Sequence, residues 1–396
     1  MSTTVEEIKK TEIKKEKKDE LLLDSLEIKG FRCFEHLSIQ ELGRVNLIVG
    51  KNNVGKTAFL EALWLYTSRG NINTLIRLLL SRDELSPYTG QHTSPSISGN
   101  DFTIKIENLS SELRNLFFGR RDFGSEGRDL AFIGSKDSYL KISTIQLRNE
   151  NGSPKMERGP YFDDIWIVLS KGLSLSVSLV ENGEETYLEF FSLTNFQNLL
   201  RKPLPQMMIQ STFVKSNGLN HTLLARLWDD ALRKGLEERA IHFLKTIAEQ
   251  ISYINFVGAE DDSSTRYPIA SIQNSMQRVP LKSFGEGLAR LLGLSLSFVQ
   301  CEHGILLIDE IESGLHYSVL PDVWKLIFKT AKDLNVQVFA TTHSFDCIEA
   351  FAQASIEDKE SEGNLIRLEN KNGAIKAVTF SENELETVTR RNIEVR

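Results

Sequence analysis

The chain has 396 residues, of which 40% are hydrophobic and 26% are charged, and its formal net charge at pH 7 is −7. This composition is typical of a globular protein, and the length predicts one large domain with a sizeable insertion. It excludes a membrane-spanning protein, because no apolar run reaches the roughly 18 residues that a transmembrane helix needs. The negative charge argues against a surface that binds nucleic acid over its whole extent.

The first 20 residues contain six lysines and six acidic residues but few apolar ones. Such a segment cannot bury enough surface to offset the entropy of ordering, and we predict a disordered tail over residues 1–20. The tail lacks the apolar stretch of a signal peptide, and the cysteines Cys33, Cys301 and Cys347 lack the spacing of metal ligands. We therefore expect a cytoplasmic protein whose cysteines are buried thiols.

Strand patterns follow this tail. Residues 25–28 alternate between polar and apolar side chains, and residues 36–40 form a second candidate strand beyond a glycine. The apolar run at 45–49 is typical of a strand that is covered on both faces. From residue 58 to residue 70 apolar side chains recur at helical spacing. These residues predict a buried strand that leads through a short loop into a helix.

The loop between that strand and that helix reads Gly-Lys-Asn-Asn-Val-Gly-Lys-Thr, which is the pattern of a phosphate-binding loop, or P-loop. Its two glycines let the backbone curl, so that N–H groups and the helix N-terminus face an anion. Lys56 is expected to reach the β- and γ-phosphates, and the Thr57 hydroxyl to bind Mg²⁺. The predicted cofactors are ATP and Mg²⁺, and the predicted nucleotide-binding residues are Gly50, Asn52, Asn53, Gly55, Lys56, Thr57 and Ala58.

The middle of the chain predicts mainly an antiparallel sheet followed by helices. A short helix at 75–80 is followed by Ser-, Thr-, Pro- and Gly-rich sequence up to residue 100. Residues 207–214 predict another strand, and residues 222–251 a long helical region with an apolar stripe. Alternating segments predict strands at 102–106, 140–147, 165–169, 173–179 and 187–191.

A second motif lies at 304–310, where the buried strand pattern Gly-Ile-Leu-Leu-Ile ends in Asp309 and Glu310. Asp309 is expected to hold Mg²⁺, directly or through water. Glu310 is expected to orient and deprotonate the attacking water, because phosphoryl transfer needs an in-line nucleophile and charge neutralisation. An apolar strand that ends in two acids is weak evidence alone, but it becomes strong in a chain that also has a P-loop.

A third motif, Ser-Phe-Gly-Glu-Gly at 283–287, precedes the acidic pair and opens a helical run. Here the sequence resembles the ATP-binding-cassette (ABC) superfamily, whose signature motif at a helix start binds the γ-phosphate of the nucleotide held by the opposite protomer. The resemblance implies that Ser283, Gly285 and Glu286 contact nucleotide across a head-to-tail dimer or higher homo-oligomer.

The remaining motifs follow in the order found in that superfamily. Residues 312–316 resemble the loop that crosses the dimer, and the apolar strand pattern at 336–342 leads to His343. His343 resembles the switch histidine that senses the γ-phosphate. Gln210 is either the loop glutamine that couples nucleotide to the neighbouring lobe or an ordinary strand residue.

Within the superfamily, the chain resembles the OLD-type, RecF-like bacterial ATPases. The resemblance is carried by Leu-Glu-Ile-Lys-Gly-Phe-Arg at 26–32, by Asp-Glu-Ile-Glu at 309–312 followed by Gly-Leu-His, and by Ala-Thr-Thr-His-Ser at 340–344. It adds Arg32 to the expected nucleotide-binding residues. One departure is Tyr317, which stands where many relatives have proline.

Only about 50 residues follow His343, and they predict a hairpin at 365–369 and 374–380 around an Asn-Gly turn, then a short terminal helix. OLD-type nucleases carry a Toprim domain in this place, and it is missing here. The resemblance therefore implies a stand-alone ATPase that regulates a separately encoded effector protein, frequently a nuclease in anti-phage defence.

The predicted fold is α/β, a P-loop NTPase of the ABC type with an N-terminal antiparallel β-lobe. Residues 21–70 form the first part of the ATPase domain, 71–280 an inserted β-lobe and helical region, and 281–396 the second part. A RecF-like DNA-repair or DNA-binding ATPase is the alternative. A transporter subunit is disfavoured by the N-terminal motif and the long insertion. A GTPase is disfavoured because Asn-Lys-Asn-Gly at 370–373 lacks the aspartate of a guanine-reading motif.

Overall fold

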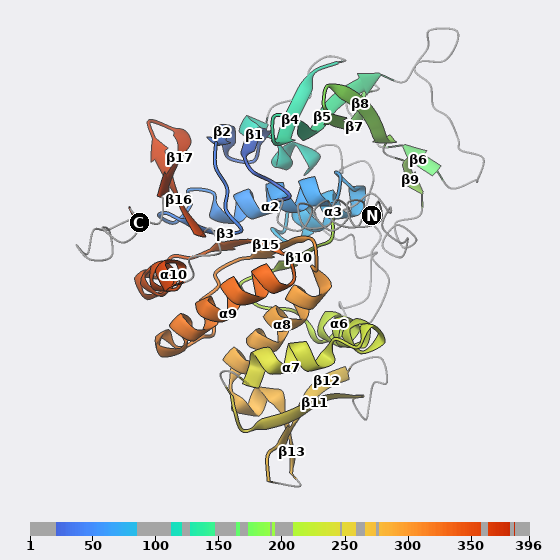
Figure 1. Cartoon of the computed structure of the whole chain (residues 1–396). Coiled ribbons are helices and arrows are strands. Elements are labelled where there is room, and N and C mark those ends of the chain that lie inside the picture. Colours follow the sequence, from blue (N-terminus) through green and yellow to red (C-terminus); the bar gives the residue numbers. More distant parts are fainter. Residues whose placement is uncertain are drawn as a thin grey trace, which may run out of the picture.

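The computed structural model describes residues 21–84, 112–120, 127–146, 164–166, 173–190, 192–194, 209–245, 248–258, 266–274, 277–357, 363–380 and 384. The predicted tail, the predicted strand at 102–106 and nearly all of the predicted terminal helix lie outside these residues. The described elements form layers (Figure 1): an antiparallel sheet, the helices α2 and α3, a largely parallel sheet, the helices from α6 to α10, and a small sheet at the far end.

The central sheet has the strand order β10-β14-β15-β3-β16-β17. Adjacent strands in this sheet are parallel, except that β16 and β17 are antiparallel and form the predicted C-terminal hairpin. The strands β3, β14 and β15 are buried along their whole length, as their continuous apolar runs predict. The strands are β3 (Val45–Val49), β10 (Ser211–Val214), β14 (Ile305–Ile308), β15 (Gln337–Thr341), β16 (Gly363–Lys371) and β17 (Ala374–Phe380).

Helices cover both faces of this sheet. On one face lie α2 (Lys56–Thr67) and α3 (Ile72–Leu80), and on the other lie α8 (Glu286–Gln300), α9 (Leu320–Asp333) and α10 (Phe345–Glu357). Successive side chains of β3 therefore enter different cores: Leu47 packs into the cluster with α8 to α10, and Ile48 into the cluster with α2.

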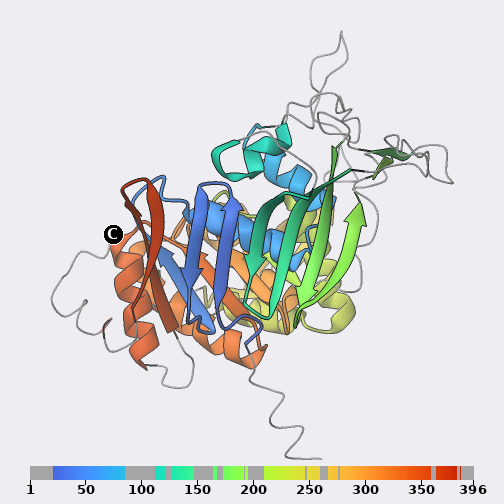
Figure 2. The ribbon, with the colours of Figure 1, turned by 90° about the horizontal axis from the view of Figure 1, so that it is seen from above.

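The second large sheet is antiparallel and has the order β2-β1-β4-β5-β7-β8 (Figure 2). The strands from the middle of the chain thus extend the sheet that the N-terminal strands begin, and the predicted antiparallel lobe is confirmed. Helix α2 is buried between this sheet and the central one, which explains why it is apolar on nearly every side. The strands are β1 (Leu26–Phe31), β2 (Phe34–Ile39), β4 (Asp129–Gly134), β5 (Ser138–Gln146), β7 (Leu173–Glu181) and β8 (Glu184–Phe190).

The helical prediction for residues 222–251 is wrong in two respects. The chain forms two helices, α6 (His221–Lys234) and α7 (Glu237–Lys245), because Gly235 adopts a left-handed conformation that ends the first. Ile251 then begins a strand of a three-stranded antiparallel sheet that the pattern did not predict. This sheet comprises β11 (Ile251–Gly258), β12 (Arg266–Ile272) and β13 (Arg278–Pro280).

The remaining described elements are two short strands and single turns of 3-10 helix. The strands β6 (Asp164–Trp166) and β9 (Ser192–Thr194) pair with each other. Single turns of 3-10 helix occur at η1 (Arg114–Leu116), η2 (Phe118–Arg120), η4 (Leu281–Phe284) and η5 (Tyr317–Val319). No helix in the described part of the chain is long and apolar enough to cross a membrane.

Candidate nucleotide site

The P-loop connects the end of β3 to the start of α2, and its glycines are required by geometry. A Cβ atom at Gly50 would lie 2.5 Å from the carbonyl oxygen of Leu368, and one at Gly55 would lie 2.6 Å from the sulfur of Cys33. Gly55 also has a φ of 94° as the N-cap of α2, in the left-handed region that favours glycine. The loop can therefore pack in this conformation only with glycine at these two positions.

The Lys56 ammonium group closes the loop on itself. It donates hydrogen bonds to the carbonyl oxygen atoms of Gly50, at 2.7 Å, and of Lys51, at 3.1 Å. Burial lowers the pKa of Lys56 from its ordinary value, although the nearby carboxylates Asp309 and Glu310 oppose that shift. The lysine is thus a partly desolvated cation whose present partners are neutral carbonyl groups.

Asp309 and Thr57 meet across the end of the central sheet. The Thr57 hydroxyl lies 3.1 and 3.3 Å from the two carboxylate oxygen atoms of Asp309, which is only 8% exposed. The Thr341 hydroxyl donates a second hydrogen bond, of 2.6 Å, to the same carboxylate. These oxygen donors fit the ligands that Mg²⁺ prefers. The described residues hold no cluster of three or more His, Cys, Asp or Glu side chains that could bind a metal ion alone, so phosphate and water oxygen atoms would complete such a site.

Glu310 follows Asp309 in an unusual backbone conformation. Its φ of 47° lies in the left-handed region, which is uncommon for a residue with a side chain. Two side chains hold it there: its N–H donates to the Thr341 hydroxyl at 2.9 Å, and its carbonyl oxygen accepts from Arg290 at 2.7 Å. The backbone of Glu310, from which its carboxylate extends, is therefore held on both sides.

Arg290 connects the end of β14 to a neighbouring strand and to helix α8. Its guanidinium group donates to the carbonyl oxygen atoms of Lys215 and Ser216, just after β10, and of Asp309 and Glu310, all at 2.7 to 2.9 Å. Burial lowers the pKa of Arg290, against the raising effect of nearby carboxylates. The helix that begins with the signature motif is thereby attached to the backbone of the two acidic residues.

The sequence assigned no role to Arg290 or Thr341, although Thr341 lies within the Ala-Thr-Thr-His-Ser motif. Both lie within apolar patterns that predict a helix and a strand, and nothing in those patterns distinguishes them from structural residues. The one available signal was their place beside motifs, Arg290 after the signature and Thr341 two residues before His343.

His343 lies beside the acidic residues, at the end of β15. Its Nδ1 atom is 3.3 Å from a carboxylate oxygen of Glu312 and 3.8 Å from one of Glu310. Its backbone N–H donates to Glu312 at 3.0 Å. The imidazole is 55% exposed, so it can contact a bound group. The structure brings His343 and Glu310 together, and the sensing role remains a prediction.

A cavity of about 1070 Å³ opens above the P-loop. Acidic and basic side chains from several elements line it, among them Arg82 and Glu84 after α3, which the sequence did not single out. Residues of the η1–η2 segment and of the β16–β17 turn form further walls. The predicted site residues in its lining are Arg32, Asn52, Asn53, Gly55, Lys56, Thr57, Ala58, Asp309 and Glu310.

The signature residues lie outside this cavity. Ser283 belongs to η4, Gly285 is the N-cap of α8 with a φ of 101°, and Glu286 is the first residue of that helix. All three are exposed, and none lines the cavity above the P-loop of the same chain. The start of α8 is accordingly free to face another molecule.

Gln210 does not belong to the site. It precedes β10 and its carbonyl oxygen accepts from the N–H of Ile305, at the start of β14, whereas Asp309 follows the end of that strand. Gln210 therefore lies at the amino-terminal ends of the parallel strands, whereas the P-loop and Asp309 lie at their carboxyl ends, and the alternative that it couples to the nucleotide is wrong.

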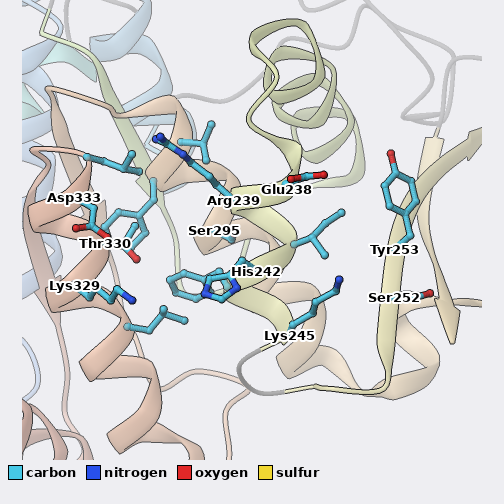
Figure 3. A pocket seen from close by; sticks show the side chains of 16 residues that line it. Glu238, Arg239, His242, Lys245, Ser252, Tyr253, Ser295, Lys329, Thr330 and Asp333 are labelled. Carbon is cyan, nitrogen blue, oxygen red and sulfur yellow. The ribbon is translucent and has the colours of Figure 1, made fainter. Parts of the chain in front are cut away.

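A second cavity, of about 890 Å³, lies on the other side of the molecule. In Figure 3 its lining side chains extend from α7, with Arg239 and His242, toward Lys329 of α9 on one side and Tyr253 of β11 on the other. It reaches Asp333, the last residue of α9, and no residue of the P-loop or of the acidic pair lines it. The cavity above the P-loop is therefore the candidate nucleotide site.

Comparison with known proteins identifies the family. The family model described as AAA ATPase domain matches residues 22–157 and 163–348. An ATP/GTP phosphatase of Helicobacter pylori is 23% identical over 368 residues, which cover 86% of this chain and 90% of that protein. The DNA replication and repair protein RecF of Thermomicrobium roseum is 32% identical over 155 residues, which cover 37% of this chain and 38% of that protein.

Among solved structures, the head of Smc bound to the C-winged helix domain of ScpA aligns with a TM-score of 0.45 and 15% identity, over 91% of this chain and 97% of that chain. The family model covers most of this chain, including the P-loop, the acidic pair and His343. The chain therefore belongs to the AAA ATPase domain family and is a P-loop ATPase.

Proposed function

We propose that this ATPase works as a head-to-tail homodimer in which each ATP lies between the P-loop of one copy and the signature motif of the other. The supporting observation is the separation of the two motifs within one chain. The cavity above the P-loop includes Lys56, Thr57 and Asp309, whereas Ser283 and Gly285 are exposed outside it. A helix start with free N–H groups is a binding site for an anion, and a second copy would supply that anion as its γ-phosphate.

The residues of this chain have distinct roles in the proposed reaction. Lys56 exchanges its two carbonyl partners for phosphate oxygen atoms, and Thr57 and Asp309 hold Mg²⁺. A Mg²⁺ ion held there would supply positive charge to stabilise the phosphate oxygen atoms. Glu310 orients and deprotonates the attacking water, and His343 contacts the γ-phosphate. Arg290 and Thr341 hold the backbone of Glu310 in its strained conformation, and so fix the point from which its carboxylate extends.

The proposal predicts that hydrolysis depends on protein concentration. Because each site needs two copies, the rate per protomer should rise with concentration and level off once dimers predominate. Phosphate release measured over a hundredfold dilution series, with light scattering at the same concentrations, tests this. A rate per protomer that stays constant while the protein is monomeric would contradict the dimeric site.

The family resemblance supports a further part of the proposal, that the ATPase regulates a separately encoded effector, a nuclease in anti-phage defence. A second candidate is a DNA-binding or DNA-repair ATPase, favoured by the 32% identity with RecF over 155 residues. The outer face of the antiparallel sheet bears on this alternative. There the cations Lys29 and Lys141 are paired with Glu27 and Glu185, which weakens their attraction for phosphate groups.

Incubation of the purified protein with plasmid DNA distinguishes the two candidates. With ATP and Mg²⁺ or Mn²⁺, we expect the plasmid to stay intact and its electrophoretic mobility to stay unchanged. An ATP-dependent mobility shift would favour the DNA-binding ATPase. Cleavage would place a nuclease centre in this chain and contradict the separate effector.

A further inference from the structure

Behind the nucleotide cavity lies a buried acid, Glu61. It belongs to α2, one turn after Thr57, and is only 2% exposed. Residues four apart lie on the same face of a helix, so Glu61 lies beneath Thr57, about 6 Å further along the helix axis. A buried carboxylate requires compensating charge, because its desolvation is costly.

Two arginines supply this charge, one at each carboxylate oxygen. The Nε atom of Arg32 donates to one oxygen of Glu61 at 3.1 Å, and the Nε atom of Arg82 donates to the other at 2.7 Å. The arginines come from separate segments, the turn between β1 and β2 and the residues just after α3. Both line the nucleotide cavity, whereas Glu61 does not. Glu61 therefore fixes two cations at the wall of the cavity through their Nε atoms.

The outer nitrogen atoms of Arg32 are incompletely satisfied. Nη1 donates to the carboxylate of Glu84 and to the carbonyl oxygen of Asn115. Nη2 is buried and has no hydrogen-bond partner among the described residues, although the Arg32 side chain is only 5% exposed. A buried guanidinium nitrogen without an acceptor is costly, and a small movement of the Arg32 guanidinium group toward the cavity would let a phosphate oxygen accept from it. Glu84, also in the lining, is an acid that a bound phosphate would have to displace or face.

We propose that Glu61 is a positioning residue for the nucleotide: its carboxylate holds Arg32 and Arg82 so that their guanidinium groups bind phosphate oxygen atoms of the nucleotide at the P-loop. Glu84 opposes this binding, because its carboxylate occupies Arg32 and repels the phosphate groups. This inference rests on the proposed function, since it concerns the same site. It assigns roles to Glu61, Arg82 and Glu84.

The proposal predicts opposite changes in MgATP affinity when the two acids are replaced, whereas net charge alone predicts the same change for both. If only net charge mattered, removing either acid would strengthen the binding of an anion. Under the proposal, Glu84→Gln strengthens the binding of MgATP, and Glu61→Gln weakens it about tenfold because two arginines lose their fixed geometry. Calorimetric titration with MgATP measures both affinities, and thermal unfolding of each variant shows whether it is folded.

Lys56→Ala in the same titration separates this inference from the proposed function. If Lys56→Ala abolishes binding and Glu61→Gln binds MgATP as tightly as the wild type, or more tightly, the positioning role is wrong and the nucleotide site stands. If Lys56→Ala binds normally, the proposed site itself fails. Weaker binding by Glu61→Gln together with tighter binding by Glu84→Gln supports the inference.

Arg82→Gln provides a second test at a more exposed position, since the Arg82 side chain is 37% exposed. Thermal unfolding of this variant shows whether the buried Glu61 tolerates the loss of one of its two cations. Arg82→Gln should weaken MgATP binding in the same direction as Glu61→Gln. Because Glu61 acts through the arginines, the double variant with Glu61→Gln and Arg82→Gln should bind MgATP only slightly less tightly than the single variant with the lower affinity. Fully additive losses would mean that Glu61 and Arg82 act independently and would overturn the positioning role.

Discussion

Replacing Glu310 with glutamine is expected to leave ATP binding intact and to lower the hydrolysis rate by about two to four orders of magnitude, the usual contribution of a general base. The backbone should not change, because the contacts that hold residue 310 reach its N–H and its carbonyl oxygen rather than its carboxylate. The variant loses only the group that deprotonates water. With hydrolysis blocked, ATP should hold the two copies together, so the ATP-bound dimer should accumulate.

Phosphate release and calorimetry measure these effects, and sedimentation with ATP measures the dimer. Glu312→Gln is the matched control: it removes a neighbouring carboxylate that also contacts His343, but one that does not line the cavity above the P-loop. We expect a smaller loss of rate from it. Rapid phosphate release by Glu310→Gln would assign the base to another residue.

The sequence predicts the centre of this site because the motifs are local and ordered. A P-loop needs a strand before it and a helix after it, and an acidic pair needs the end of a buried strand. Those requirements follow from residues within ten positions of each other. The contact between Thr57 and Asp309 then follows from the parallel sheet, whose strand ends meet at one edge.

The residues that support this site, Arg290 and Glu61, could not be predicted, because their partners are distant in the sequence. Arg290 binds backbone carbonyl groups, including those of Lys215 and Ser216, and any residue type offers a carbonyl. Glu61 binds arginines from two segments that the sequence separates from it by 29 and 21 residues. Neither pairing leaves a pattern in a single sequence, because the partners are set by how distant segments pack.

Some secondary-structure elements could be predicted from local sequence, and others could not. Alternation predicts the antiparallel lobe, since one face of β1, β2, β4, β5 and β7 packs into the core that α2 shares. The boundary between α7 and β11 was missed because apolar residues continue at helical spacing up to Ile251, and a short apolar run fits a helix or a strand equally well. Tertiary pairing with β12 decides the outcome at that residue.

Two variants that are inactive alone are expected to regain activity when mixed. Lys56→Ala removes the charge that binds the β- and γ-phosphates, and should abolish ATP binding at its own P-loop. Ser283→Arg puts a bulky cation at an exposed helix start, outside the P-loop cavity of its own chain. In any dimer that one variant forms alone, both composite sites are damaged, so neither variant should hydrolyse ATP by itself.

In a mixed dimer, one site combines both substitutions and the other combines an intact P-loop with an intact signature motif. Random exchange makes half of the dimers mixed, and each has one good site, so the mixture should recover about one quarter of the wild-type rate. Ser38→Arg, a change at another exposed serine, on β2, is the matched control and should hydrolyse ATP normally by itself. The measurement is phosphate release against mixing ratio, with a maximum expected at equal amounts. If Ser283→Arg alone hydrolyses ATP at the wild-type rate, the signature motif does not act on the partner's nucleotide. Dimerisation would then not be what completes the site, because the P-loop and the acidic pair would be sufficient within one chain.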